Sequence, residues 1–380
     1  MALNISSGSK CNHWRFYTLL AALVLFSCRC PAQQSRADAE PEVLRLLVWD
    51  GYTPSHAVKT FEAQMEAKYG RRIRLQISEV ESDDFFDPVR AKRVDLITIS
   101  HHMFKDERSN YIAKGLILPP NLENIPNHAL VMPELMQAES HTSNGVIYGV
   151  PLAMGSYGLA YNTGLVESEP TSWRIFWDPA FANTYVLGAY EYTYNVNITA
   201  LALGYPREWI DSYDRLNNPE FKEKLRQLAV NARGFWSGAD RPEDLLNASL
   251  AMAWGDSFSG LQRQGEHWEV AAPEEGTPKW IDEYVLTWAL ADRPFMKQIA
   301  EEWINWSLST EFQVDHLLRE VRASPVVTNI QDRITPQEKE RLKRQSTSIP
   351  QQTYSERDRN GLALLWEEAM RGIVPERKGR

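Results

Sequence analysis

The sequence of 380 residues predicts a two-lobed α/β protein, on the evidence of its length, its composition and the order of its predicted strands and helices. A hydrophobic content of 43% with 11% aromatic residues is typical of a globular chain. The chain is longer than one hydrophobic core usually serves, so we expect two lobes of roughly 150 residues each. Its first elements are predicted as strand, helix, strand, helix and strand, an order that favours a sheet with parallel pairs.

The first predicted sheet follows from hydrophobic periodicity. Apolar runs and alternating patterns define its elements, and Gly70 stands where the cap of a helix belongs. The first strand ends at Trp49-Asp50, and the third ends at Ser100-His101-His102. In order, the elements are a strand over 43–48, a helix over 55–69, a strand over 73–77 and a strand over 94–99.

Later elements are predicted from the same patterns. A capping box of Thr310 and Gln313 is expected to open one of the helices, and the polar stretch 345–356 is expected to be a surface connection. The strands are predicted over 146–151, 159–161, 185–187, 250–254, 268–271 and 285–289, and the helices over 294–306, 311–319 and 360–371.

The N-terminal segment has the pattern of a secretion signal. Lys10, His13 and Arg15 precede an apolar run over 16–27, which is shorter than the about 20 residues of a membrane-spanning helix. We expect a signal peptide over 1–32 with cleavage after Ala32, which makes the mature protein soluble and periplasmic. The segment 25–28 also resembles a lipoprotein box, so anchoring through Cys28 remains an alternative.

Cysteine content and charge exclude several classes of protein. Cys11, Cys28 and Cys30 all lie in the predicted leader, so neither a disulfide framework nor a cysteine metal site is expected in the mature chain. The leader holds three basic and no acidic residues, which leaves 38 basic and 50 acidic residues and a formal charge of −12. That balance argues against nucleic-acid binding and mildly favours a cationic partner.

Several predicted strands are flanked by an aromatic residue beside an acid. Ligands of open α/β sheets bind beyond the carboxyl ends of strands, so these pairs are candidates for a site. An indole face attracts an ammonium group, and a carboxylate adds charge-assisted hydrogen bonds. With thirteen tryptophans, any single pair is better explained by chance, whereas the whole set predicts an amine site. The set consists of Trp49-Asp50, Trp254-Gly255-Asp256, Trp280-Ile281-Asp282, which is expected to precede a strand, and Glu191 within the tyrosine-rich run 189–194.

Motifs of enzymes and metal sites are incomplete. Gly255-Asp256-Ser257 is similar to one esterase motif, but that family needs an Asp three residues before its last His, and Gln313 stands before His316. There is no G-x-S-x-G elbow, phosphate-binding glycine loop or H-E-x-x-H helix. Adjacent His101 and His102 at a strand end should point in opposite directions, with no third ligand evident. We therefore expect no catalysis, no cofactor and no metal.

An ordered series of short motifs resembles the spermidine/putrescine-binding periplasmic proteins, the solute-binding components of polyamine importers. Each motif is weak alone, but the ordered series is specific, and the match covers nearly all of residues 43–375. The motifs are Trp49-Asp50-Gly51-Tyr52, Gly149-Val150-Pro151, residues 158–162, 170–173, 176–179, 203–205 and 253–256, Pro273-Glu274-Glu275-Gly276 and Trp280-Ile281-Asp282.

The resemblance implies the fold of a type II periplasmic binding protein. Each of its two α/β lobes has a mixed, mostly parallel sheet flanked by helices, and the ligand lies in the cleft between the lobes. Lobe 1 is expected to comprise residues 43–148 and 279–322, and lobe 2 residues 149–278 and 323–376.

The resemblance also implies a set of ligand-binding residues. His102 and Arg322 stand where the family commonly has tyrosine. A cation such as Arg322 is unfavourable in an amine pocket unless it pairs with a carboxylate or faces away. The implied set is Trp49, Asp50, Ser100, His102, Glu191, Trp236 as a lid, Trp254, Asp256, Asp282 and Arg322.

The function implied is capture of a polyamine of the spermidine, putrescine or norspermidine type for an ABC importer and its permease. The alternative is a periplasmic polyamine sensor that is the partner of a membrane-bound cyclic-dinucleotide signalling protein. In either role we expect a monomer that is not an enzyme and binds no nucleic acid.

Overall fold

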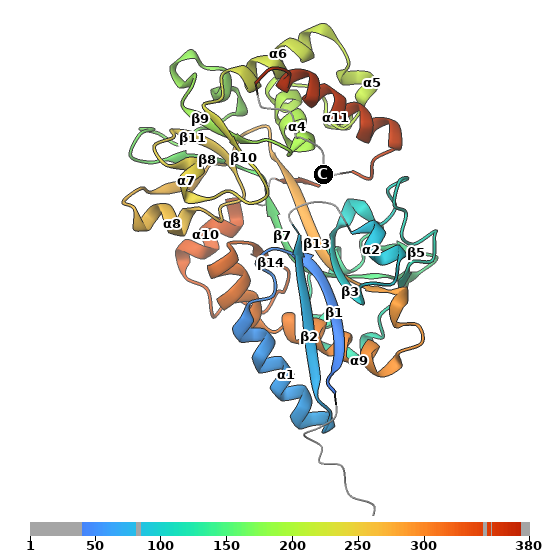
Figure 1. The fold of residues 1–380 in the computed structure, drawn as a ribbon. Helices are drawn as coiled ribbons and strands as arrows, with labels where there is room; N and C mark the ends of the chain where they lie inside the picture. The colour runs from blue at the N-terminus through green and yellow to red at the C-terminus, as the bar shows by residue number, and fades with distance from the viewer. Residues whose placement is uncertain (1–39, 81–84, 345–347, 351, 374–380) are drawn as a thin grey trace, which may run out of the picture. The chain divides into compact units, whose positions relative to one another are not determined.

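The computed structural model describes residues 40–80, 85–344, 348–350 and 352–373, which contain two separate β-sheets with helices around them (Figure 1). The described residues from Pro41 onward belong to one compact unit. The predicted signal peptide and the lipidation site at Cys28 lie outside the described residues. Within the described ranges, no helix is long and apolar enough to cross a membrane.

The larger sheet has eight strands in the order β14-β7-β13-β3-β1-β2, with β4 and β15 also paired to β13. Strand β1 pairs in parallel with both β2 and β3, whereas β13 runs antiparallel to β3 and β7. Its strands are β1 (Glu42–Trp49), β2 (Ile73–Val80), β3 (Leu96–Ser100), β4 (Ile117–Leu118), β7 (Gly149–Ser156), β13 (Thr277–Thr287), β14 (Ser324–Pro325) and β15 (Ser348–Pro350). The helices that follow these strands are α1 (Ser55–Tyr69), α2 (Phe86–Arg90), α3 (Pro133–Met136), α9 (Pro294–Ser307), a π-helix (Phe312–Val321) and α10 (Pro336–Arg344).

The smaller sheet has five strands in the order β10-β9-β11-β8-β12. Parallel pairs join β10, β9 and β11, and antiparallel pairs add β8 and β12. Its strands are β8 (Gly158–Asn162), β9 (Tyr185–Gly188), β10 (Gly234–Trp236), β11 (Leu250–Ala253) and β12 (Trp268–Val270). Its helices are α4 (Tyr192–Ala202), α5 (Tyr213–Leu216), α6 (Pro219–Val230), α7 (Pro242–Leu245), α8 (Phe258–Arg263) and α11 (Glu356–Met370), and a separate hairpin is formed by β5 (Thr142–Ser143) and β6 (Val146–Ile147).

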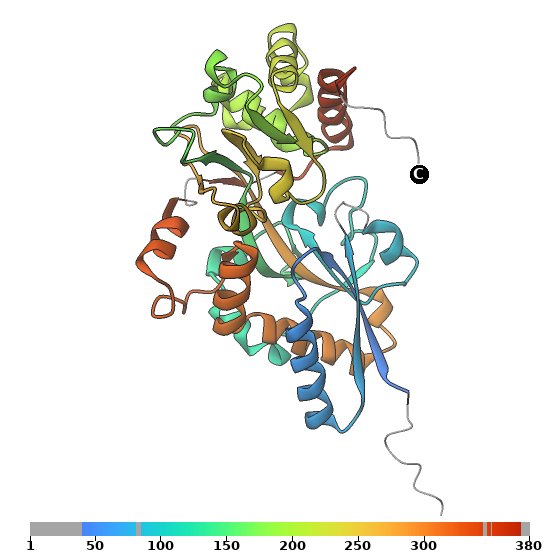
Figure 2. The same ribbon diagram turned by 60° about the vertical axis from the view of Figure 1, so that its left-hand side comes forward.

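Two long strands connect the sheets. Only Tyr157 separates β7 of the larger sheet from β8 of the smaller one, and β13 returns the chain after β12. Figures 1 and 2 show β13 and β7 running together from the level of the smaller sheet into the larger one. In the larger sheet β7 and β13 add antiparallel pairs, and in the smaller sheet β8 does so, so both sheets carry more antiparallel pairing than the predicted strand and helix order suggests. The two-lobed α/β fold is as predicted.

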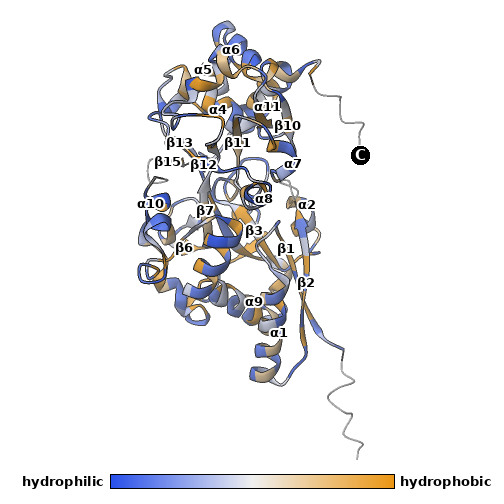
Figure 3. Cartoon of the chain, turned by 90° about the vertical axis from the view of Figure 1, so that its left-hand side faces the viewer, coloured by the Kyte–Doolittle hydropathy of each residue, from blue (hydrophilic) through white to orange (hydrophobic). Residues whose placement is uncertain are grey.

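Each sheet has its own hydrophobic core. One cluster surrounds the smaller sheet and includes residues of α11, and two clusters cover the larger sheet. Figure 3 shows hydrophobic residues along β1 and β3, whereas α10 is mostly hydrophilic. The lobe boundaries stay a prediction, and packing differs from them both at β7, which belongs to the larger sheet although 149–278 was expected in lobe 2, and after residue 323. Val326, Val327, Ile330 and Ile334 pack with the larger sheet, although 323–376 was expected in lobe 2.

The local predictions agree with the structure best where periodicity is strong. Helix α1 spans the predicted residues, and Gly70 caps it at a φ of 62°, which glycine adopts without strain. The predicted strand over 285–289 is wrong at both ends, because β13 begins at Thr277 and a 3₁₀ turn follows Thr287. The last helix begins at Glu356 rather than at residue 360, because Ser355 caps it and accepts a hydrogen bond from the Asp358 backbone.

The predicted capping box at Thr310 and Gln313 is also wrong. The Gln313 amide is buried, donates hydrogen bonds to the carbonyls of Leu152 and Ser307, and accepts one from the Val326 backbone. This side chain therefore ties the π-helix to β7 instead of capping a helix.

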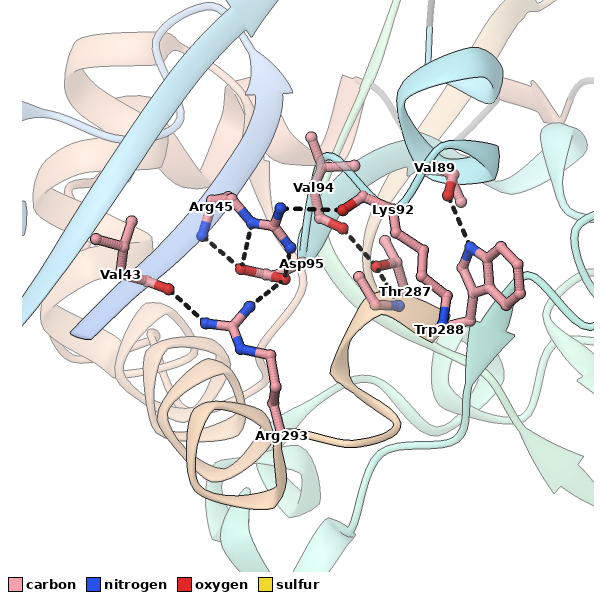
Figure 4. Close-up of polar contacts among 10 residues, drawn as sticks. Val43, Arg45, Val89, Lys92, Val94, Asp95, Thr287, Trp288 and Arg293 are labelled. Carbon is pink, nitrogen blue, oxygen red and sulfur yellow. Dashed lines mark hydrogen bonds and ion pairs between the residues drawn. The ribbon is translucent and has the colours of Figure 1, made fainter.

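A buried charge cluster lies at the end of the larger sheet where β3 begins (Figure 4). The Asp95 carboxylate is fully buried and accepts from Arg45 Nη2 at 2.6 Å and from Arg293 Nη1 at 2.7 Å. Arg293 also donates to the Val43 carbonyl. These bonds join β1, β3 and the start of α9, so the charges in this region are satisfied within the protein.

Candidate functional site

A cavity of about 390 Å³ is lined by residues of both sheets. Its walls come from the segments that follow β1, β3, β9 and β11, from the middle of β13 and from helix α11. The carboxyl ends of parallel strands thus meet at the cavity, as the sheet rule predicts.

The structure places nine of the ten predicted residues on this cavity wall. They are Trp49, Asp50, Ser100, His102, Glu191, Trp254, Asp256, Asp282 and Arg322. Their role in binding a ligand is not tested by their position, so it remains a proposal.

Trp236 is the exception. It is 2% exposed, its indole Nε1 donates to the Met252 carbonyl at 2.9 Å, and it is not among the residues that line the cavity. Its ring lies 6.3 Å from that of Trp254, which does line the cavity. Trp236 ends β10 and packs inside the core of the smaller sheet, so the expected lid is a support behind Trp254.

Asp282 lies within β13, although it was expected to precede a strand. It is 6% exposed, and its two carboxylate oxygens accept hydrogen bonds from the hydroxyls of Tyr52 and Ser100. A register shift between Asp282 and Glu283 marks an irregularity in its pairing with β7. The extra residue is Leu152 on β7, because Asp282 pairs with Ala153 and the next residue, Glu283, pairs with Pro151.

Asp256 stands on a loop that a buried carboxylate organises. Asp240 is 2% exposed and accepts hydrogen bonds from the backbone of Trp254, Gly255 and Ser257 and from the Ser257 hydroxyl. The Gly255 φ of 104° is strained for any residue with a side chain. This loop holds Trp254 and Asp256 at the cavity together.

The Asp256 carboxyl is accessible from the cavity but is otherwise surrounded by protein. That burial raises its pKa to about 7, and the charges of Asp240 and Asp50 raise it further in the same direction. Burial and the charge of Asp50 likewise raise the pKa of Glu79, at the end of β2. Negative charge is therefore concentrated here, and a bound cation would relieve the repulsion.

Aromatic rings surround these acids. The Trp254 ring lies 4.7 Å from that of Tyr157, 5.2 Å from Tyr194 and 6.5 Å from Trp280. Trp280 is on β13, so rings from both sheets meet here. Such faces suit an ammonium group or a methylene chain.

His102 borders the cavity on a 3₁₀ turn and not on a strand end, and its ring lies 5.7 Å from that of His101. Burial lowers its pKa well below the usual value, and His101 and Arg359 lower it further. It is therefore a neutral imidazole at pH 7. Among the described residues, no group of three or more His, Cys, Asp and Glu side chains could hold a metal ion.

Two arginines line the cavity, and they differ in their partners. Arg359 of α11 donates from Nε to Asp106 Oδ2 at 2.8 Å, so its charge is matched. Arg322 follows the π-helix at a φ of 63° and lies 5.5 Å from the Phe258 ring. Among the described residues its guanidinium forms no ion pair with a carboxylate, and burial lowers its pKa.

Sequence reasoning missed several cavity residues. Tyr52 lies in a motif that we quoted, and Trp280 lies in a quoted aromatic and acidic pair, so both carried a signal. Tyr354 and Arg359 lie in segments without such a pattern and reach the cavity only through the packing of α11. The aromatic and charged residues missed are Tyr52, Tyr190, Tyr192, Tyr194, Trp280, Tyr354 and Arg359.

Comparison with known proteins agrees with this geometry. The family model for bacterial extracellular solute-binding proteins matches residues 91–350. The structure is similar to the spermidine/putrescine ABC transporter substrate-binding protein PotD of Streptococcus pneumoniae, with 16% identity, a TM-score of 0.67 and coverage of 86% of this chain and 98% of that chain.

Two further solved structures show the same architecture. The TpPotD lipoprotein of Treponema pallidum has 18% identity and a TM-score of 0.63, over 86% of this chain and 99% of that chain. The binding protein MotA of A. tumefaciens B6, in complex with glucopine, has 14% identity and a TM-score of 0.62, over 86% of this chain and 99% of that chain. At these identities the likeness establishes the two-lobed type II fold and leaves the ligand open.

Proposed function

Because the chain belongs to the family of bacterial extracellular solute-binding proteins, we propose that it captures a small amine of the polyamine type for an ABC importer. The family is one of solute binding and not of catalysis. Similar structures include a spermidine/putrescine ABC transporter substrate-binding protein and a binding protein in complex with glucopine, so the fold does not choose the ligand. The chemistry of the cavity has to choose it.

The observation that carries the proposal is the combination of acids and aromatic rings around one cavity. Asp50, Glu191, Asp256 and Asp282 line it together with Trp49, Trp254 and Trp280. An ammonium group that leaves water needs charge-assisted hydrogen bonds, and the carboxylates offer them. The indole faces can hold the methylene chain between the ammonium groups.

The size of the cavity suits such a ligand. Small-molecule pockets usually measure about 300–1,000 Å³, and this cavity of about 390 Å³ is at the lower end of that range. Since its walls come from both sheets, a ligand there contacts both, and binding favours the arrangement in which both contacts are made. The alternative role as the partner of a membrane sensor stays a prediction.

Isothermal calorimetry with putrescine, spermidine, norspermidine and spermine tests the proposal. We expect dissociation constants in the micromolar range or below, about −8 kcal/mol or more favourable. Asp256→Asn removes a carboxylate without changing its shape and should weaken binding by at least about tenfold, since it removes a charge-assisted contact.

The matched control is Asp292→Asn, which makes the same change at an exposed residue outside the cavity. This control should bind as the unaltered protein does. No heat with any of the four amines, from protein with a cooperative thermal transition, would overturn the polyamine proposal.

A further inference from the structure

Arg322 is the charge in the cavity that an amine ligand does not explain. A guanidinium beside ammonium groups is repulsive, unless it pairs with a protein carboxylate or turns away from the ligand. Arg322 lines the cavity, and none of the ion pairs among the described residues includes it.

The position of Arg322 is set by its backbone. It is the residue after the π-helix, in the left-handed region at a φ of 63° and a ψ of 14°. A non-glycine residue in this region is uncommon, and it is retained only where the surrounding structure holds it. Its guanidinium lies over the Phe258 ring at 5.5 Å, which leaves its hydrogen-bond donors unused by that contact.

Arg322 also lies beside the loop that carries Asp256. Its Nε is 4.0 Å from the point where a Cβ on Gly255 would stand, and Gly255 directly precedes Asp256. The two side chains nevertheless form no ion pair. Burial and the charges of Asp240 and Asp50 all act to raise the pKa of Asp256, and no positive charge offsets them.

The second arginine on the wall behaves differently. Arg359 is held by Asp106, so its charge is matched before any ligand arrives. Arg341 does not neutralise the charge of Arg322, because it is itself a cation. Burial and the charge of Arg322 lower the pKa of Arg341 to about 10. In this part of the cavity, Asp256 and Arg322 are therefore the two charged groups that have no ion-pair partner among the described residues.

Resting on the proposed function, we infer that the amine ligand also carries a carboxylate next to one of its ammonium groups, and that Arg322 binds this carboxylate. A guanidinium presents parallel N–H donors that match a carboxylate in a bidentate geometry. The ammonium group next to this carboxylate then binds Asp256, on the loop that lies beside Arg322. The ligand class is then a diamine or polyamine skeleton with one acid group, as in a basic amino acid.

Matched ligand pairs test this inference by calorimetry. Putrescine and ornithine differ by one carboxylate while both keep two ammonium groups, and cadaverine and lysine differ in the same way. We expect the acid-bearing member of each pair to bind at least about tenfold more tightly, the range of a charge-assisted hydrogen bond. In Arg322→Gln the ratio of the two dissociation constants should fall to about one.

Two variants keep the test sharp. Arg322→Lys retains the charge but loses the bidentate fork, so we expect it to keep part of the preference. Arg207→Gln, at an exposed arginine outside the cavity, should keep all of it. A thermal melt of each variant confirms that the protein tested is folded.

The outcomes separate the two proposals. If the wild-type protein binds putrescine and cadaverine as tightly as ornithine and lysine, or more tightly, the inference is overturned while amine capture stands. The same holds if Arg322→Gln leaves the ratio unchanged. If no member of either pair and no polyamine binds, the proposed function itself fails.

Discussion

Two regions of the molecule place arginine and aspartate close together, and they use these charges in opposite ways. At the beginning of β3, Asp95 is fully buried and accepts hydrogen bonds from Arg45 and Arg293 (Figure 4). At the cavity, Asp256 and Arg322 flank Gly255 without forming an ion pair. In the first region the carboxylate has two arginine partners within the chain, whereas in the second neither Asp256 nor Arg322 has an ion-pair partner among the described residues.

The difference follows from what each region has to do. A buried carboxylate without partners costs several kcal/mol, so a charge that joins β1, β3 and α9 has to be satisfied within the protein. A binding site has to keep its groups unsatisfied until the ligand arrives, because only then does the ligand gain their interaction energy. Unmatched charge is therefore a better indicator of the site than charge alone.

The largest effect that this comparison predicts is on stability. Asp95→Asn leaves Arg45 and Arg293 without their counter-charge and should lower the free energy of unfolding. The two arginine side chains are 32% and 33% exposed and can still reach water. We therefore expect a loss of roughly 2–4 kcal/mol, somewhat below that of a fully buried pair.

Urea unfolding followed by far-UV circular dichroism measures this loss. Arg322→Gln provides the contrast, because removal of a desolvated cation without a partner should leave stability unchanged or raise it. The comparison breaks down if Arg322→Gln costs as much stability as Asp95→Asn.

The second effect is on the pH dependence of binding. The pKa of Asp256 is raised to about 7, chiefly by burial, so its carboxyl is mostly neutral at pH 6 and mostly ionised at pH 8. Amine ligands stay protonated across this range, and their ammonium groups favour the ionised carboxylate. We expect the affinity for putrescine to rise by about tenfold from pH 6 to pH 8, with protons released on binding.

Calorimetry in buffers of different ionisation enthalpy detects the released protons. Asp256→Asn should show a flat profile over the same range, since it has no group to titrate there. An affinity that falls with rising pH would show that Asp256 does not meet an ammonium group.

The same contrast explains which features could be predicted from sequence. Strand ends with Trp49-Asp50 and Trp254-Gly255-Asp256 could be found because apolar runs locate the strands and the residues after them reach the cavity. Trp236 also ends a strand, β10, but it is enclosed by its neighbours in the core. Local sequence does not distinguish a tryptophan that faces the cavity from one that stands behind it.

Ion pairs between residues far apart in the sequence could not be predicted, because they depend on the tertiary fold. Arg359 is neutralised by Asp106, and the two are 253 positions apart. Arg322 was expected to be unfavourable in an amine pocket unless paired, and only the structure shows that it lines the cavity. Whether a charge is matched depends on tertiary contacts, so the composition of the site could be predicted while its charge balance could not.

The smallest predicted effect concerns Asp282, which lines the cavity and also accepts hydrogen bonds from side chains of the protein. Tyr52 is 4% exposed, and its hydroxyl donates to Asp282 Oδ2 at 2.7 Å, so this carboxylate is oriented by the protein before a ligand binds. Tyr52→Phe removes that donor and keeps the ring, and we expect amine affinity to fall by about three- to fivefold, near 1 kcal/mol. Tyr185→Phe is the matched control, because its hydroxyl bonds the Leu228 carbonyl in the smaller sheet and should affect stability without affecting affinity. If Tyr52→Phe binds amines more tightly, the hydroxyl competes with the ligand for Asp282 instead of orienting the carboxylate toward it.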